Sequence, residues 1–261
     1  MTIPCYHVDA FASTVFHGNP AAVCPLEAWL PDATLQNIAA ENNLSETAFL
    51  VARGSDFDLR WFTPTIEVDL CGHATLAAAF VLFTERGFSG NTVRFHSRSE
   101  LLTVTRKGDV ITLDFPSRPA APCAAPETLV RGLGRQPLEV LQARDYLAVF
   151  ASAAEVRALK PDFATLRTLD ALGIIATAPG DDYDFVSRFF APAAGINEDP
   201  VTGSAHCTLI PYWARRLGKP ALLARQVSAR GGELICRDAG DRVFIGGRAT
   251  IYLRGEIQIP K

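Results

Sequence analysis

The sequence predicts an α/β protein of two similar lobes, each with strands packed around one central helix. The main observation is a stretch that occurs twice: RWFTP at 60–64 with LCGHA at 70–74, and RFFAP at 188–192 with VTGSA at 201–205. Each copy has the pattern of a strand, a turn broken by proline and a glycine at a helix start. A repeat of this period indicates duplicated architecture, and 261 residues suffice for two domains of ordinary size.

The helix expected after the first copy, 73–86, is apolar on nearly every side, as the run ATLAAAFVL at 74–82 illustrates. A helix without a polar face is buried all round. We therefore expect it at the centre of its lobe, surrounded by strands. The second copy leads into an equivalent helix at 204–217, which Gly218 ends.

In the first half, alternation of apolar and polar residues predicts strands, and a helical period predicts one further helix. The expected strands are 3–11, 21–24, 46–52, 57–62, 93–95, 101–105 and 110–115, and the further helix is 31–43. The segment 117–126 is rich in proline and alanine, a composition that predicts a linker between the lobes.

The second half repeats this plan. The expected helices are 126–133 and 152–160, and the expected strands are 138–141, 146–150, 172–176, 185–190, 226–229, 233–237 and 242–245. A last strand, 250–259, has no counterpart at the end of the first half, so we expect it to cross back and complete the first lobe. The predicted lobes are 1–117 with 248–261, and 118–247.

Composition excludes several classes of partner. The formal net charge is −3 and no basic run occurs, so nucleic acid is not an expected partner. No apolar run reaches membrane-spanning length, and the first residues lack the pattern of a signal peptide. The six cysteines form no C-x-x-C pair, which argues against structural zinc. We expect a cytoplasmic protein with reduced thiols and no membrane partner.

Glu46 opens a strand directly ahead of the apolar residues 48–51. Partial burial at such a boundary raises the pKa of a carboxyl group and prepares it for proton transfer. A solvated carboxylate at a strand end is the alternative interpretation.

His73 follows Gly72 in the first turn of the buried helix, where the helix dipole favours a neutral imidazole that can relay a proton. A hydrogen-bonded capping or core histidine is the alternative. Cys71 lies just before the helix start, where the pKa of a thiol falls, so it could act as a base. Its equivalent in the repeat is Thr202, which rules out a symmetric pair of cysteine bases.

Asp199 precedes the second helix start. A carboxylate there stabilises the helix by capping; the functional alternative is that it fixes His73 or holds the substrate. The glycine-led helix starts at Gly72 and Gly203 together predict an anion site, because free N–H groups and the positive dipole end both point outward. The five histidines lack the spacing of metal ligands, so no metal site is predicted.

Five short motifs follow one another at consistent spacing: DAFA at 9–12 with GNP at 18–20, NLSE at 43–46, FTP at 62–64, GH at 72–73, and ED at 198–199 with TGSA at 202–205. Together they resemble the PhzF-like isomerase family, which is named after the phenazine-biosynthesis isomerase. The resemblance spans nearly the whole chain.

The resemblance implies a diaminopimelate-epimerase-like fold of two pseudo-symmetric lobes, each with a mixed sheet wrapped around a central helix, and an active site between them. It implies a homodimer without a cofactor. Glu46 would be the catalytic acid and base, assisted by His73 and Asp199. The substrate, a small carboxylated metabolite, would be bound by Asn19, Cys71, Gly72, Thr202, Gly203 and Ser204.

The expected reaction removes a proton from the substrate through Glu46 and returns it elsewhere, which shifts a double bond. Related epimerases and racemases place one cysteine in each lobe, and here these positions hold Cys71 and Thr202. One alternative is therefore an epimerase or racemase of an amino acid or proline-like substrate that uses Glu46 or Cys71. A further alternative is a binding protein without turnover.

Overall fold

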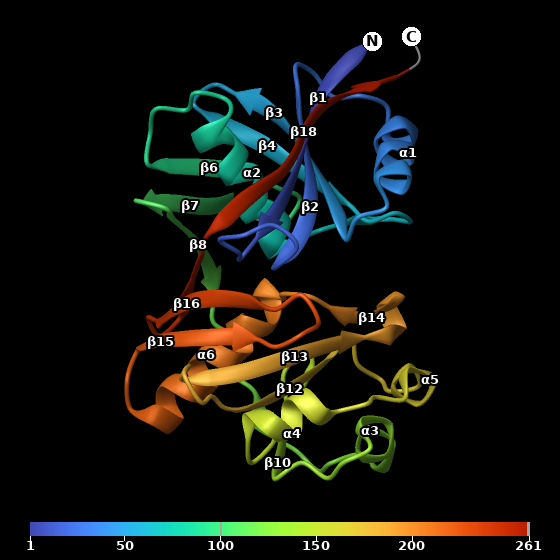
Figure 1. The fold of residues 1–261 in the computed structure, drawn as a ribbon, viewed down its shortest axis with the longest axis vertical. Coiled ribbons are helices and arrows are strands. Elements are labelled where there is room, and N and C mark those ends of the chain that lie inside the picture. The colour runs from blue at the N-terminus through green and yellow to red at the C-terminus, as the bar shows by residue number, and fades with distance from the viewer. Residues whose placement is uncertain (100, 260–261) are drawn as a thin grey trace. The chain divides into compact units, whose positions relative to one another are not determined.

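The computed structural model describes residues 1–99 and 101–259, which form two compact units (Figure 1). The first unit contains residues 1–114 and the segment from 246 onward, and the second contains residues 115–245. Residues 260–261 of the predicted segment 248–261 lie outside the described residues. Both units combine a mixed sheet with helices, so the predicted α/β class is confirmed.

The first unit is built on a mixed β-sheet. Its strands are β1 (Thr2–Ala10), β2 (Asn19–Leu26), β3 (Glu46–Arg53), β4 (Asp56–Phe62), β5 (Glu67–Val68), β6 (Thr92–His96), β7 (Leu101–Lys107), β8 (Val110–Pro116) and β18 (Ala249–Gln258). β1 lies between β18 and β2 and is antiparallel to both. β2 is parallel to β3, β3 is antiparallel to β4, and β4 is parallel to β6. β6, β7 and β8 form the expected antiparallel meander.

Helix α2 (Gly72–Thr84) is the buried helix of this unit. Eleven of its 13 residues are buried, because alanine, leucine and valine leave no polar stripe along it. It packs against β1, β2 and β3. Helix α1 (Asp32–Asn42) covers a separate buried cluster that includes residues of β1, β2 and β3.

The second unit repeats this order of strands. Its strands are β9 (Ala121–Pro122), β10 (Glu139–Gln142), β11 (Tyr146–Val149), β12 (Ile174–Pro179), β13 (Phe185–Ala191), β14 (Ile196–Asp199), β15 (Ala221–Gln226), β16 (Gly232–Asp238) and β17 (Arg242–Gly247). β11 is parallel to β12, β12 is antiparallel to β13, and β13 is parallel to β15. β11, β12, β13 and β15 thus correspond to β2, β3, β4 and β6.

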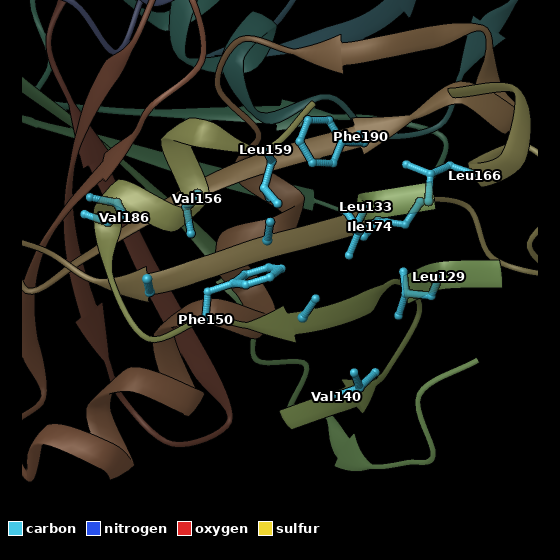
Figure 2. Close-up of a cluster of buried hydrophobic side chains, with 14 residues drawn as sticks. Leu129, Leu133, Val140, Phe150, Val156, Leu159, Leu166, Ile174, Val186 and Phe190 are labelled. Atoms are coloured by element: carbon cyan, nitrogen blue, oxygen red, sulfur yellow. The ribbon is translucent and has the colours of Figure 1, made fainter. Parts of the chain in front are cut away.

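Helices cover both faces of the second sheet. Phe185 of β13 stacks on Trp213 of α6 (Gly203–Leu217), with ring centroids 5.6 Å apart. Val186, the next residue, points to the opposite face, where it joins the buried cluster shown in Figure 2. That cluster includes residues of α3 (Glu127–Leu133), α4 (Ala153–Ala158) and α5 (Phe163–Leu166). Among the described residues, every helix is too short or too polar to serve as a membrane span.

The repeated sequence builds the same ion pair in both units. Arg60 of β4 donates from Nε to Glu67 at 2.7 Å, and its guanidinium lies 5.1 Å from the centre of the Phe62 ring. Arg188 of β13 donates to Glu198 at 2.7 Å and lies 4.9 Å from the Phe190 ring. The R-x-F pattern of the repeat therefore has a structural role that is common to both copies.

Two predicted segments are wrong. The strand expected at 226–229 instead covers Ala221–Gln226, because these residues pair with β16 from Ala221–Arg237 to Gln226–Gly232. The linker expected at 117–126 contains β9, which pairs with β10, and Arg118 N–H donates to Cys207 O. Proline has no backbone N–H to donate, so it is accommodated on an edge strand, where that donor is not needed for pairing. Helix α5 was not expected from the sequence; Asp162 caps it by accepting hydrogen bonds from the N–H groups of Ala164 and Thr165.

Candidate active site

Glu46 and His73 meet inside the first unit. Glu46 is the first residue of β3 and His73 is the second residue of α2; their side chains bring Oε2 and Nε2 within 3.1 Å. Glu46 is 9% exposed and His73 is 4% exposed. Glu46 is therefore a buried partner of the histidine, and the interpretation as a solvated strand-end carboxylate is wrong.

Two further predicted residues complete this cluster. The side-chain amide of Asn19, at the start of β2, lies 3.1 Å from His73 Nδ1 and is fully buried. Cys71 Sγ lies 3.5 Å from the same Nδ1 atom. Three adjoining elements, β2, β3 and α2, thus bring Asn19, Glu46, Cys71 and His73 together.

The surroundings of His73 favour its charged form. Burial opposes protonation, but the interactions with Cys71 and Glu46 outweigh burial and raise the pKa of the imidazole well above its ordinary value. Because the thiol of Cys71 is itself protonated at neutral pH, the charge that favours the imidazolium there is that of Glu46. A carboxylate in contact is a stronger influence than the partial charge of a helix terminus. The expectation of a neutral ring is therefore wrong while Glu46 is ionised.

Asn19 can serve either protonation state of His73. A neutral Nδ1 accepts a hydrogen bond from the amide NH₂ group, whereas a protonated Nδ1 donates to the amide oxygen. A half-turn of the Asn19 amide exchanges these two groups at the same position. The histidine can therefore gain or lose a proton while it keeps its orientation.

Cys71 is a protonated thiol at neutral pH. Burial and the charge of Glu46 raise the pKa of Cys71 to about 11. The lower pKa expected from the neighbouring helix start is wrong, because burial in an apolar surrounding has the larger effect. Cys71 is therefore poorly suited to act as a base.

The same residues bring together potential metal ligands that the sequence spacing did not reveal. One donor atom each of Glu46, Cys71 and His73 lies within 4.8 Å of the other two. However, Cys71 Sγ is 3.5 Å from Nδ1 and 4.0 Å from Nε2 of His73. The sulfur thus lies beside the ring rather than in line with Nε2, which faces Glu46. A shared ion would require Cys71 to adopt another rotamer, so the arrangement fits a metal poorly.

In the second unit, Asp199 lies beside the start of α6. Its Oδ2 accepts a hydrogen bond of 2.5 Å from the hydroxyl of Thr202, the N-cap residue. Gln226 accepts from Thr202 N–H at 2.9 Å and donates to Asp199 O at 2.7 Å. The N-cap position expected for Asp199 therefore belongs to Thr202, and the carboxylate fixes the orientation of that residue.

Arg144 is a candidate residue that was not expected from the sequence. It donates to Ser204 Oγ at 3.0 Å and pairs with Asp145 at 2.8 Å. Because Ser204 follows the helix-start Gly203, the guanidinium lies at the positive end of α6. Its side chain is 37% exposed, so it is accessible to an anion.

Arg144 makes the contact in the second unit that Asn19 makes in the first. Asn19 lies 3.1 Å from His73 and Arg144 donates to Ser204 at 3.0 Å, and both partners follow a helix-start glycine. Asn19 begins β2 and Arg144 lies two residues before β11, the strand that corresponds to β2. The two residues are one position apart in register, because Ala22 pairs with Thr47 and Tyr146 pairs with Ile174.

Comparisons with known proteins agree with this architecture. A family model for phenazine biosynthesis-like proteins matches residues 8–255. An uncharacterized isomerase of Pseudomonas aeruginosa is 52% identical over 259 residues, which cover 99% of this chain and 100% of that protein.

Solved structures show the same fold. A phenazine biosynthesis protein of the PhzF family from Enterococcus faecalis matches with a TM-score of 0.98 and 50% identity, covering 99% of this chain and 100% of that one. A hydroxyproline epimerase from Agrobacterium vitis matches with a TM-score of 0.60 and 13% identity, covering 98% and 92% of the two chains; this likeness concerns the fold alone. The chain therefore belongs to the PhzF-like, phenazine biosynthesis-like family and has its diaminopimelate-epimerase-like fold.

Proposed function

We propose that this protein is an isomerase in which Glu46 removes a proton from one carbon of a small carboxylated metabolite and returns it to another carbon. The double bond shifts as the proton moves, and the oxidation state of the substrate is unchanged. The reaction therefore needs no cofactor. The observation that carries this proposal is the buried contact between Glu46 and His73, with Asn19 on the far side of the ring.

Each member of the cluster has a distinct part in this reaction. Glu46 is a carboxylate held at 3.1 Å from His73, whose charge balances it in a poorly solvated position. When Glu46 takes the substrate proton it becomes neutral, and His73 remains hydrogen-bonded through Asn19. One positioned acid and base of this kind contributes about 10²–10⁴-fold to a rate.

The negative charge that develops on the substrate needs donors aimed at it. The helix-start N–H groups at Gly72 and at Gly203, with Ser204 and the Arg144 guanidinium, are suited to a carboxylate and to the charge that spreads into it during proton removal. That Asp199 and the helix starts of both units act on one substrate stays a prediction, as does the homodimer.

An epimerase with a cysteine base is less well supported. The pKa of Cys71 is raised to about 11, so the thiolate is scarce at neutral pH. The equivalent position in the second unit holds Thr202, whose hydroxyl donates to Asp199. Neither residue supplies the thiolate that such a mechanism needs.

The test is uptake of deuterium at carbon. The protein is incubated in deuterated water with a panel of small unsaturated carboxylic acids, and each acid is examined by NMR. We expect the wild type to label at least one acid, Glu46→Gln to abolish labelling, and Glu41→Gln, an exposed change on α1, to preserve it. Labelling that survives in Glu46→Gln would overturn the role of Glu46, and an unlabelled panel that binds without exchange would favour a protein without turnover.

A further inference from the structure

Cys5 and Cys24 lie opposite each other on neighbouring strands of the first unit. Tyr6 of β1 pairs with Val23 of β2, and His7 pairs with Ala22, so the antiparallel register continues to Cys5 and Cys24. Opposite residues of this kind have Cβ atoms about 4.5–5.5 Å apart, close to the spacing of about 3.5–4.5 Å in a disulfide. Both side chains belong to the buried cluster beneath α1.

The two thiols differ in accessibility. Cys5 is 4% exposed, whereas Cys24 is fully buried. A hydrogen bond from Cys24 lowers the pKa of Cys5, and His7 acts in the same direction. The same hydrogen bond and complete burial raise the pKa of Cys24. Cys5, the more accessible thiol, is therefore assigned as the nucleophile, with Cys24 held beside it.

A groove gives small molecules a route toward this cluster. The groove has a volume of about 660 Å³ and is lined by residues of α1, β18 and the N-terminus. Ile38, Ile257 and Ile259 line the groove and also pack into the cluster that contains both cysteines. Cys5 itself is 4% exposed, so side chains of this cluster must move aside before a hydroperoxide in the groove reaches it.

We propose that Cys5 and Cys24 form an oxidisable pair that closes to a disulfide between β1 and β2 on reaction with a hydroperoxide. The Cys5 thiolate attacks one peroxide oxygen, the O–O bond breaks, and hydroxide or alkoxide leaves with the electron pair. Cys5 is then a sulfenic acid. The Cys24 sulfur attacks Cys5, the S–O bond breaks, and the Cys24 proton leaves with the hydroxyl group as water.

This pair is separate from the proposed active site. Cys24 is five residues along β2 from Asn19, a span of about 17 Å in a strand. Oxidation of the pair is thus expected whether or not Glu46 is the catalytic base. The inference therefore does not depend on the proposed function.

Hydrogen peroxide and mass spectrometry test the inference on the full chain. After peroxide treatment, we expect the denatured wild type to have lost two of its six thiols, and a digest to contain one peptide pair joined through Cys5 and Cys24. In Cys24→Ser the sulfenic acid has no partner, so dimedone should label Cys5. Dithiothreitol should restore both thiols of the wild type.

Cys207 and Cys236 provide a matched control, because they are buried neighbours in the second unit. Burial raises the pKa of Cys236, so this pair should remain reduced under the same treatment. Oxidation of Cys207 and Cys236 at the same rate as Cys5 and Cys24 would overturn the inference. It would also be overturned if Cys5 and Cys24 stayed reduced in the wild type, a result that does not depend on the folding of any variant.

Discussion

The two units share a fold but differ at the positions of Glu46 and His73, the pair proposed to carry proton transfer. Thr47 pairs with Phe62 in the first unit and Ile174 pairs with Phe190 in the second, so Glu46, which contacts His73, corresponds by register to Gly173. Gly173 is buried and has no side chain. His73 corresponds to Ser204, and Arg144 contacts Ser204 as Asn19 contacts His73. The duplicated frame therefore carries an acid–base pair in one unit and a cationic helix start in the other.

This difference separates the features that support the shared fold from those that could carry the reaction. The features kept in both copies, such as the pairs Arg60–Glu67 and Arg188–Glu198, hold the frame together. The features that diverge lie around the residue after each helix-start glycine. We infer that a single carboxylate performs the proton transfers, since the equivalent position in the second unit has no group that can accept a proton.

The largest expected effect comes from removing the base. Glu46→Gln should lower turnover of an identified substrate by about 10²–10⁴-fold, because the amide cannot take the proton. Ile174→Val, next to the equivalent position Gly173 of the second unit, should change turnover less than about twofold, since one methylene in a core mainly affects stability. Steady-state kinetics of both variants checks this contrast, and equal losses would contradict it.

The shared ion pairs should matter to both units, and more to the second. Arg188→Met should lower the free energy of unfolding by about 2 kcal/mol, because it removes the ion-pair partner of the partly buried Glu198. Arg60→Met should lower it by less, because Glu67 keeps its ion pair with Arg98 at 3.0 Å. Urea denaturation measures both values, and a larger loss for Arg60→Met than for Arg188→Met would contradict this expectation.

A smaller effect is expected from the cation of the second unit. Arg144→Gln should raise KM for a carboxylated substrate about tenfold, which corresponds to about 1.4 kcal/mol, and change kcat little. Arg215→Gln, near the opposite end of α6 and exposed, serves as the control. An unchanged KM in Arg144→Gln would remove Arg144 from substrate binding.

The protonation of His73 should appear in the pH dependence of stability. Its pKa in the folded protein is raised above the ordinary value of 6.5. The resulting stabilisation is complete below pH 6.5 and is lost as the pH rises through the folded-state pKa. The free energy of unfolding of the wild type should therefore fall toward alkaline pH more steeply than that of His73→Gln. Parallel pH profiles of the two proteins would be inconsistent with a charged His73.

The smallest effect is expected at Cys71. Because burial keeps its thiol protonated, Cys71→Ala should leave kcat within about twofold of the wild-type value, the range expected when no proton-transferring group is lost. A loss comparable to that of Glu46→Gln would instead support a thiol base and an epimerase-like reaction. Steady-state kinetics with the same substrate distinguishes these results.

Much of the frame is predictable because its signals are local. The apolar run at 74–82 predicts a buried helix, and the repeat predicts two similar units. The pairing of Asn19 with His73, and of Arg144 with Ser204, is not predictable in this way. It depends on strand register, which brings together residues 54 and 60 positions apart.

The errors at the candidate site share a physical cause. The sequence places Cys71 and His73 at a helix start, and the helix dipole alone predicts a lower thiol pKa and a neutral imidazole. Burial of Cys71 and the contact with Glu46 act in the opposite direction. These effects depend on neighbours in space, so they required the structure.

The central claim, that one carboxylate removes and returns the proton, is tested most directly by tracing that proton. A substrate identified by exchange is deuterated at the carbon that loses the proton, and the reaction is run in ordinary water. If a single base removes and returns the proton, part of the deuterium should appear at the carbon that gains a proton, on the same face of the molecule. Complete loss of deuterium to water, with addition from the opposite face, would contradict the account and require a second base.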